Sequence, residues 1–286
     1  MRAEKLTPAR LFIYATLILA VGFFLLPACF ALVNSFKPLE EIQSGNQFGL
    51  PQHWTLDAWY KAWASACTGS ASCDGLSVYA KNSLIMAIPS TLVPTLWGCF
   101  NGYVLSKWRF KGTDLIFFLL LFGTFLPAGL FLLPLSMIVN SMGLGDSLSG
   151  LIVVHILYSL PITLYFRNYL VGFPGELIKA ARIDGAGLFT IFWRIVLPAA
   201  TPILVVVLIM QFTAVWNDFL FALVLSPSDQ QTVTVGLNNL TSAQHGTPEY
   251  NVYMAAAFIA AAPTILIYIL AGKYFVRGLV AGAVKG

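Results

Sequence analysis

Long stretches without a charged residue are the feature that most constrains the fold of this 286-residue chain. A helix that crosses the hydrocarbon core of a membrane needs roughly 20 mostly apolar residues. Six uncharged stretches meet this requirement: residues 11–33, 82–106, 115–145, 147–166, 195–217 and 250–272. Only 10% of the chain is charged, whereas soluble domains contain about 25% charged residues. The pattern predicts an all-α polytopic membrane protein with six transmembrane helices.

Two of these stretches need interpretation. Residues 115–145 are too many for one crossing, so we expect a span near 115–139 followed by an outer loop at 140–148. The first stretch, 11–33, is longer than the roughly 7–15-residue apolar region of a signal peptide, so we expect an uncleaved first span.

The positions of Lys and Arg predict the orientation. With the N-terminus in the cytoplasm, all 16 of these residues except Lys37, Lys61 and Lys81 lie on the inner side. The positive-inside rule therefore favours two cytoplasmic termini. The net charge of +4 is too small to suggest nucleic acid as a partner. The expected organisation is a cytoplasmic tail at 1–10, a six-helix transmembrane domain at 11–275 with an inner segment at 174–196, and a cytoplasmic tail at 276–286.

The first outer loop, residues 34–79, contains two cysteines and a group of aromatic residues. Cys67 and Cys73 form a disulfide or remain as two free thiols; a disulfide requires that the loop face an oxidising compartment. Zinc is not favoured, because His53 is a single distant imidazole. The aromatic residues predict a short amphipathic segment that anchors at the membrane surface or contacts an external partner: Trp54, Trp59, Tyr60 and Trp63.

The inner segment between the fourth and fifth spans has the pattern of two short helices joined by a turn. Residues 176–184 have helix-forming composition with an acid in the first turn, and Gly185 can end that helix. Residues 188–196 predict the second helix, and Leu197 and Pro198 begin the fifth span. Ala180 and Ala181 would give the first helix a smooth side that suits docking to a partner. A helix resting on lipid headgroups is the alternative.

The spacing of this segment resembles the loop of binding-protein-dependent ABC importer permeases. That loop has Glu-Ala-Ala, three residues, Gly, nine residues and Ile-x-Leu-Pro. Here Lys179, Ala180 and Ala181 are followed by Gly185, and then by the stretch 195–198. The form Ala-Ala-x-x-Asp-Gly-Ala at 180–186 resembles the carbohydrate branch.

Two other stretches support the resemblance. Residues 213–225 resemble the Trp-Asn-acid stretch of sugar permeases, and 278–286 resemble the end of a maltose-importer permease. The loop with Cys67 and Cys73 resembles the glucose/mannose-type members.

The resemblance implies a type I ABC importer permease fold in a bacterial inner membrane. It implies a second permease subunit, forming a heterodimer, two copies of a cytoplasmic ATPase and an extracytoplasmic sugar-binding protein. The chain itself would bind no cofactor, and ATP and Mg would be used by the ATPase. It also lacks the G-x-x-x-x-G-K-[ST] phosphate loop, so we do not expect it to hydrolyse ATP. The residues expected to couple to the ATPase are Glu176, Lys179, Ala180, Ala181, Arg182, Asp184, Gly185, Ile195, Leu197 and Pro198.

One residue departs from the family pattern. Lys179 stands where the family usually has Glu, which can pair with a basic residue of the ATPase. Either the ATPase surface differs, or Glu176 supplies the acid, since residues i and i+3 of a helix share a face.

Four residues of the fifth span are candidates for the substrate path. Asp218 is an acid near its outer end, where a charge is expensive unless it faces water or a partner. Gln211 and Asn217 can hydrogen-bond sugar hydroxyls, and Trp216 can stack on a sugar ring. The alternative is structural: the polar pair bonds neighbouring helices and Trp216 lies at the membrane interface. For His155, a neutral imidazole bonded to a neighbouring helix is preferred to a proton relay.

The predicted function is import of a sugar, expected to be a monosaccharide such as glucose or mannose. Two other classes remain as alternatives. An ion-driven secondary transporter would have charged coupling sites deep in the spans and internal repeats, whereas this chain shows one shallow acid and no repeat. A non-transporting assembly subunit would have no need of the docking segment.

Overall fold

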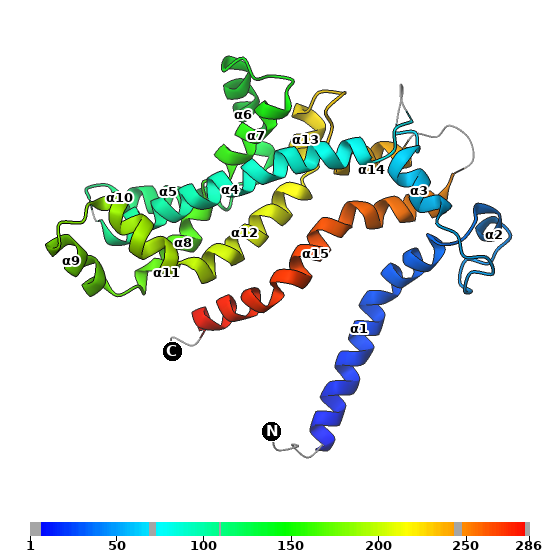
Figure 1. Cartoon of the computed structure of the whole chain (residues 1–286), viewed down its shortest axis with the longest axis horizontal. Helices are drawn as coiled ribbons and strands as arrows, with labels where there is room; N and C mark the ends of the chain where they lie inside the picture. The colour runs from blue at the N-terminus through cyan, green and yellow to red at the C-terminus, as the bar shows by residue number, and fades with distance from the viewer. Residues whose placement is uncertain (1–6, 69–72, 109, 243–247, 284–286) are drawn as a thin grey trace. The chain divides into compact units, whose positions relative to one another are not determined.

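The computed structural model describes residues 7–68, 73–108, 110–242 and 248–283, with side chains described as far as residue 272. Every regular element in this part is a helix (Figure 1). The chain divides into two compact units. Unit 1 comprises Met1–Ser77 and Leu237–Ala260, and unit 2 comprises Val78–Gly236 and Ala261–Gly286. The first helices are α1 (Pro8–Asn34), α2 (Leu39–Gln43), α3 (Asp57–Ala64), α4 (Ser77–Lys107), α5 (Thr113–Gly123), α6 (Gly129–Ser141), α7 (Leu148–Tyr158) and α8 (Ile162–Val171). The remaining elements are α9 (Gly175–Ile183), α10 (Leu188–Ile191), the π-helix η1 (Phe192–Val196), α11 (Leu197–Ala199), α12 (Thr201–Trp216), α13 (Leu220–Leu225), α14 (Val233–Ser242) and α15 (Tyr250–Ala283).

Four helical stretches in the described residues are long and apolar enough to cross a membrane: Pro8–Asn34, Ser77–Lys107, Leu148–Val171 and Tyr250–Gly272. A fifth is obtained if α10–α11 and α12 are counted together as one broken span. The chain is therefore a multi-pass membrane protein, and the prediction of six transmembrane helices is not confirmed.

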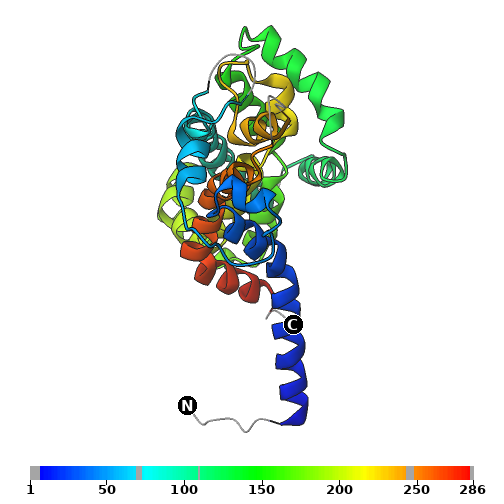
Figure 2. The ribbon, with the colours of Figure 1, turned by 90° about the vertical axis from the view of Figure 1, so that its right-hand side faces the viewer.

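The predicted third span, 115–139, is divided into two short helices. α5 ends at Gly123 and α6 begins at Gly129, and Figure 2 shows that the chain changes direction between them. Pro127 lies in the gap and has no N–H to continue a helical hydrogen-bond ladder. The absence of charge indicates an apolar segment, but it does not show where a helix within that segment breaks.

The predicted fifth span, 195–217, also begins later than expected. The helical stretch Leu188–Ala199 meets α12 at an angle of 80°. Ala200 is the junction, with φ −83° and ψ 0°. Ile195, Leu197 and Pro198 therefore lie before the bend, and the long apolar helix starts at Thr201. The prediction placed its start too early because the sequence is uncharged on both sides of the bend.

Each of the two predicted tails, 1–10 and 276–286, overlaps with a helix. α15 continues to Ala283, so residues 276–283 of the predicted C-terminal tail are helical. α1 starts at Pro8, where Thr7 Oγ1 accepts the Arg10 N–H at 3.4 Å as an N-cap. The rest of the predicted tail at 1–10 lies outside the described residues.

Unit 1 is organised around the buried ammonium group of Lys37. Its Nζ donates to the carbonyls of Asn46 at 2.6 Å and Gly49 at 2.8 Å, and its side chain is fully buried. The Lys37 carbonyl in turn accepts the side-chain N–H of Asn251 at 3.0 Å. A charge is buried at acceptable cost only when such partners surround it, so Lys37 fixes the 46–49 loop to the start of α15.

Glu41 holds the next part of the same loop. Its carboxylate accepts the backbone N–H of Gln52 at 3.0 Å and of His53 at 3.4 Å, and the side chain of Asn46 at 2.6 Å. The Gln52 N–H is the largest cause of the lowered pKa of Glu41. These bonds favour the ionised carboxylate.

The aromatic segment of this loop is α3. It buries Ala58 and Ala62 and leaves Trp63 and Tyr60 exposed. Lys61 Nζ pairs with Glu249 at 2.7 Å, which ties α3 to the residue before α15. Cys67 and Cys73 are joined by a disulfide a few residues after α3.

Lys37→Met is expected to lower the free energy of unfolding of unit 1 by about 2–4 kcal/mol, because it leaves buried carbonyls without a donor. Lys81→Met is the matched control, since Lys81 is exposed at the start of α4. Limited proteolysis of the 44–53 loop measures the effect. Equal resistance of the two variants would show that the Lys37 contacts do not hold the loop.

In unit 2 the close approach of α8 to α4 depends on two glycines. A Cβ at Gly102 would lie 2.7 Å from the backbone nitrogen of Arg167, and one at Gly98 would lie 3.3 Å from the backbone nitrogen of Thr163. Small residues four apart let transmembrane helices pack with their backbones close together. The pair places α8, and the segment that follows it, against the end of α4.

Candidate functional site

The inner segment at 174–196 forms α9, a turn, α10 and the π-helix η1, all in unit 2 (Figure 1). The two predicted helices at 176–184 and 188–196 are thus present, the first within one residue of its expected bounds. We call residues 174–196 the coupling segment, after the role that the sequence analysis predicts for them.

Gly185 ends α9 with a backbone conformation that suits glycine. Its φ is +82°, in the left-handed region. The Gly185 N–H donates to the Arg182 carbonyl at 3.0 Å, and the Ala186 N–H donates to the Ala181 carbonyl at 2.9 Å. This pair of bonds is a Schellman motif, which satisfies the last carbonyls of a helix. Gly185 therefore sets the direction in which the chain leaves α9.

One side of α9 is fixed to the core of unit 2. Ile178 and Ala181 are buried in a cluster with Tyr103 of α4 and with Phe166 and Leu170 of α8. The prediction that Ala180 and Ala181 together form a docking side is therefore wrong for Ala181. Consecutive helical residues point about 100° apart, so only Ala180 faces outward.

The opposite side of α9 is free of contacts with the core. It consists of Glu176, Lys179, Ala180 and Ile183, which are all exposed and spaced as neighbours on one helix face. We call these four residues the outward face. Ile183 is 87% exposed, although a large aliphatic side chain is normally buried. Glu176 and Lys179 make no ion pair with any described residue.

Residues at the end of α4, which sequence reasoning missed, hold the coupling segment in place. The guanidinium of Arg182 lies 3.7 Å from the ring centroid of Trp108, a cation–π contact. Arg182 is thus turned toward its own chain. Lys107 Nζ donates to the carbonyl of Phe173 at 2.6 Å, just before α9. The signal available in the sequence was Lys107-Trp108, a basic and an aromatic residue at the end of a span.

Aromatic rings attach the second helix in a similar way. Phe100 stacks on Phe189 with centroids 5.4 Å apart and meets Phe192 edge-on at 5.2 Å. Phe192 also stacks on Tyr103 at 6.0 Å. A displacement of α9 or α10 is therefore transmitted to α4 through direct side-chain contacts. Of the other predicted coupling residues, Asp184 and Pro198 are exposed, while Ile195 and Leu197 pack against the core cluster.

A second feature of unit 2 is a cavity of about 450 Å³. Polar groups from α7, from α12 and from the α5–α6, α7–α8 and α12–α13 junctions line it, among apolar and aromatic side chains: Thr124, His155, Ser159, Gln211 and Asp218.

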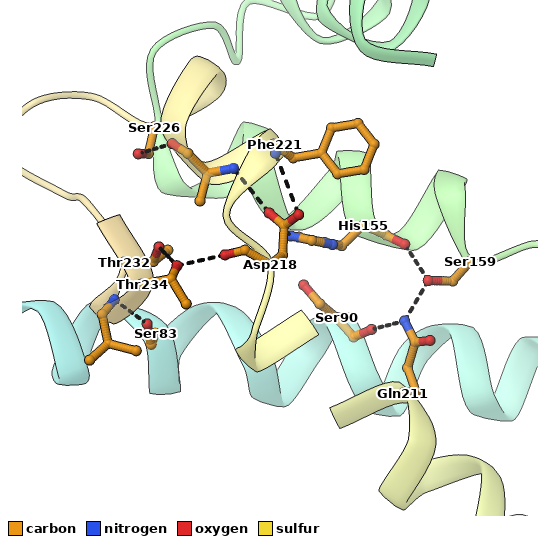
Figure 3. A network of polar contacts seen from close by, with 12 residues as sticks. Ser83, Ser90, His155, Ser159, Gln211, Asp218, Phe221, Ser226, Thr232 and Thr234 are labelled. Atoms are coloured by element: carbon orange, nitrogen blue, oxygen red, sulfur yellow. Dashed lines mark hydrogen bonds and ion pairs between the residues drawn. The ribbon is translucent and has the colours of Figure 1, made fainter. Parts of the chain in front are cut away.

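The predicted substrate-path residues have different positions relative to this cavity. Gln211 is buried and its side-chain N–H₂ donates to Ser159 Oγ and to the Ser90 carbonyl (Figure 3). Trp216 is 1% exposed and stacks on Phe212 at 5.6 Å, so its ring offers no free face to a sugar. Asn217 is exposed and does not line the cavity.

Asp218 lies beside His155, and both line the cavity. The His155 Nε2 atom is 3.6 Å from Asp218 Oδ2. The Asp218 carboxylate also accepts the N–H groups of Phe221 at 3.4 Å and Ala222 at 3.0 Å, so it caps α13 (Figure 3). The structure brings His155 together with Asp218, a pairing of residues 63 positions apart that the sequence analysis did not anticipate.

The chain matches a family of known proteins over most of its length. Residues 81–280 match the model of the family described as binding-protein-dependent transport system inner membrane component. An inner membrane ABC transporter permease protein from Escherichia coli is 32% identical over 291 residues, covering 100% of both chains. A diacetylchitobiose uptake system permease protein from Streptomyces coelicolor is 32% identical, covering 89% of this chain and 82% of its own.

Solved structures share the fold. A chain of a bacterial ABC transporter involved in the import of the acidic polysaccharide alginate superposes with a TM-score of 0.77. The two chains are 21% identical, and the match covers 96% of this chain and 100% of the other.

Proposed function

The chain belongs to the binding-protein-dependent transport system inner membrane components and is a permease of the carbohydrate branch of ABC importers, and from this premise we propose that its coupling segment receives the motion of a separate ATPase. The ATPase would close on ATP and displace α9 and α10. Their contacts with α4 and α8 would pass the displacement to the helices, which alternate between inward and outward access.

The outward face of α9 is the observation that supports this proposal most strongly. Ile183 is 87% exposed on a short helix whose other side is buried in the core of unit 2. An exposed aliphatic residue on a firmly held helix suits insertion into an apolar groove of a partner. We retain all of the predicted ATPase-coupling residues in the proposal. Two of them, Ala181 and Arg182, would hold α9 against the core of unit 2 and the Trp108 ring.

The proposed assembly has the partners that such an importer requires. It would contain a second permease subunit, two ATPase copies and an extracytoplasmic sugar-binding protein. The ATPase copies would use ATP and Mg, and this chain would bind no cofactor.

The proposed topology has six crossings and two cytoplasmic termini. It counts the broken pair α5–α6 as one crossing and α12, which follows the bend at Ala200, as another. The placement of 13 of the 16 Lys and Arg residues on the inner side supports this orientation.

We propose a sugar as the substrate, and a monosaccharide such as glucose or mannose as the first to examine. Relatives are named for diacetylchitobiose, α-glucosides and xylose or arabinose, so the family accepts sugars of several sizes. Affinity of the partner binding protein for glucose, mannose, xylose, maltose and diacetylchitobiose identifies the class. Tight binding of a disaccharide alone would refute the monosaccharide proposal and leave the permease assignment intact.

Co-purification tests the proposed assembly. The tagged chain, expressed with its genomic neighbours, is expected to elute with an ATPase subunit and a second permease. ATP hydrolysis by the co-purified complex should rise when the sugar-loaded binding protein is added. Elution without an ATPase under gentle detergent conditions would contradict the proposal.

Glu176→Lys is expected to reduce ATP-driven uptake roughly fivefold, because it converts an attraction to a basic ATPase residue into a repulsion. Glu40→Lys, an exposed acid on α2 in unit 1, is the matched control and should transport normally. If Glu176→Lys also transports normally with the unmodified ATPase, Glu176 does not replace the acid missing at Lys179.

A further inference from the structure

The cavity of unit 2 lies where three helical stretches are interrupted. Thr124 belongs to the break between α5 and α6, Ser159 to the break between α7 and α8, and Asp218 to the break between α12 and α13. Backbone that leaves the helical pattern at membrane depth is tolerated where it lines a cavity with polar contents. In transporters such discontinuous helices surround substrate sites.

His155 gives this cavity an unsatisfied polar atom. Its side chain is 5% exposed, and Nε2 has no hydrogen-bond partner within the described part of the chain. Asp218 Oδ2 is 3.6 Å away, slightly too far for a hydrogen bond. A buried polar atom without a partner is uncommon and calls for a ligand, ion or water. A hydroxyl group placed between the two side chains would satisfy both.

Aromatic rings form the neighbouring wall. Tyr158 lies edge-on to Phe221 at 5.1 Å and to Phe131 at 5.6 Å, and all three residues line the cavity. Small-molecule sites commonly combine apolar and aromatic walls with a few placed polar groups, in volumes of about 300–1,000 Å³. The cavity, at about 450 Å³, has this composition and size.

We propose that this cavity is a sugar-binding site inside this subunit, in which the Asp218 carboxylate and His155 Nε2 bind the same sugar hydroxyl or adjacent ones. The proposal rests on sugar transport as the function of the complex. Gln211 closes the inner end of the site through Ser159, and the rings of Tyr158 and Phe221 contact the apolar face of the sugar. The site would hold the sugar in transit, after its release from the binding protein.

Asp218→Asn separates the ligand role from the capping role. Asn retains one side-chain oxygen, which can still accept the Ala222 N–H that Asp218 accepts at 3.0 Å, and only the longer bond from the Phe221 N–H at 3.4 Å is given up. Asn also loses the charge that strengthens a bond to a hydroxyl. In the complete complex in vesicles, we expect sugar transported per ATP hydrolysed to fall roughly tenfold. Stimulation of ATP hydrolysis by the loaded binding protein should remain. His155→Gln should behave similarly.

Two matched exchanges at exposed positions serve as controls. Asp229→Asn and His53→Gln should leave transport per ATP unchanged. If Asp218→Asn and His155→Gln transport like the controls, the pair is structural and the proposal is wrong.

Protection of a cavity cysteine tests occupancy directly. With Cys29 and Cys99 replaced, Ala214→Cys places a thiol in the cavity lining. The transported sugar of the panel should slow its reaction with N-ethylmaleimide several-fold, and Asp218→Asn should abolish this protection. Val224→Cys, on α13 but outside the lining, should show no protection. Absence of protection in a complex that transports the sugar would refute the proposed binding site, and it would be compatible with the proposed function.

Discussion

Ile183→Asp is expected to weaken binding of the ATPase to the permease by about 30-fold or more. Ile183 is the most exposed large hydrophobic residue of the outward face, and central apolar anchors of interfaces contribute about 2 kcal/mol or more when removed. The Asp carboxylate would in addition be buried in the apolar groove of the ATPase without an opposite charge to pair with it. Titration of the detached ATPase onto permease in nanodiscs measures the change.

The fold of the variant should be intact, since Ile183 makes little contact with the core of unit 2. Ile183→Met is the control, because it keeps an apolar side chain of similar volume. Wild-type ATPase affinity in Ile183→Asp would show that α9 does not dock through its outward face.

Gly185→Pro is expected to lower ATP-driven uptake about 100-fold, through a local cost of about 3 kcal/mol. Proline fixes φ near −65°, whereas Gly185 has φ +82°, and it removes the N–H that bonds the Arg182 carbonyl at 3.0 Å. The exit from α9 would be redirected, and α9 and α10 could no longer contact α4 together. Initial rates of sugar uptake in vesicles measure this loss.

Alanine variants of two neighbouring glycines provide the control. Gly185→Ala should cost roughly 1–2 kcal/mol, because a side chain is strained in the left-handed region. Gly187→Ala should be close to neutral, since Gly187 has φ −78° and open space around it. Equal uptake in the two alanine variants would mean that the turn conformation is irrelevant to coupling.

The sequence was sufficient to predict an all-helical membrane protein and the positions of the helices α9 and α10. Charge-free stretches indicate membrane helices because charge is excluded from lipid, and this signal located α1, α4 and α15. The helix-forming composition of residues 176–184, followed by Gly185, predicted α9 and its end because both depend on local backbone chemistry.

Helix breaks were harder to predict. The gap between α5 and α6 and the bend at Ala200 lie in uncharged sequence, where composition on either side is the same. Prolines mark these regions, but a proline can either kink a helix or end it, depending on its neighbours in space.

The cavity could not be predicted because it depends on contacts between distant segments. Gln211 and Asp218 were selected as isolated polar residues in a span, whereas their roles depend on Ser90, Ser159 and His155 from other helices. Trp216 was selected for its chemistry, but its ring is covered by Phe212. The same limitation hid Trp108, whose importance arises from the position of Arg182.

ATP-driven uptake by the purified complex is the measurement that tests the central claim most directly. Vesicles containing this chain with its partner permease and ATPase are loaded with ATP, and labelled sugar is supplied on the binding protein. Uptake should require ATP and a catalytically active ATPase, and it should persist after ionophores have dissipated the proton and sodium gradients. Uptake that continues without an active ATPase and stops when the gradients are lost would contradict the account and identify an ion-driven transporter.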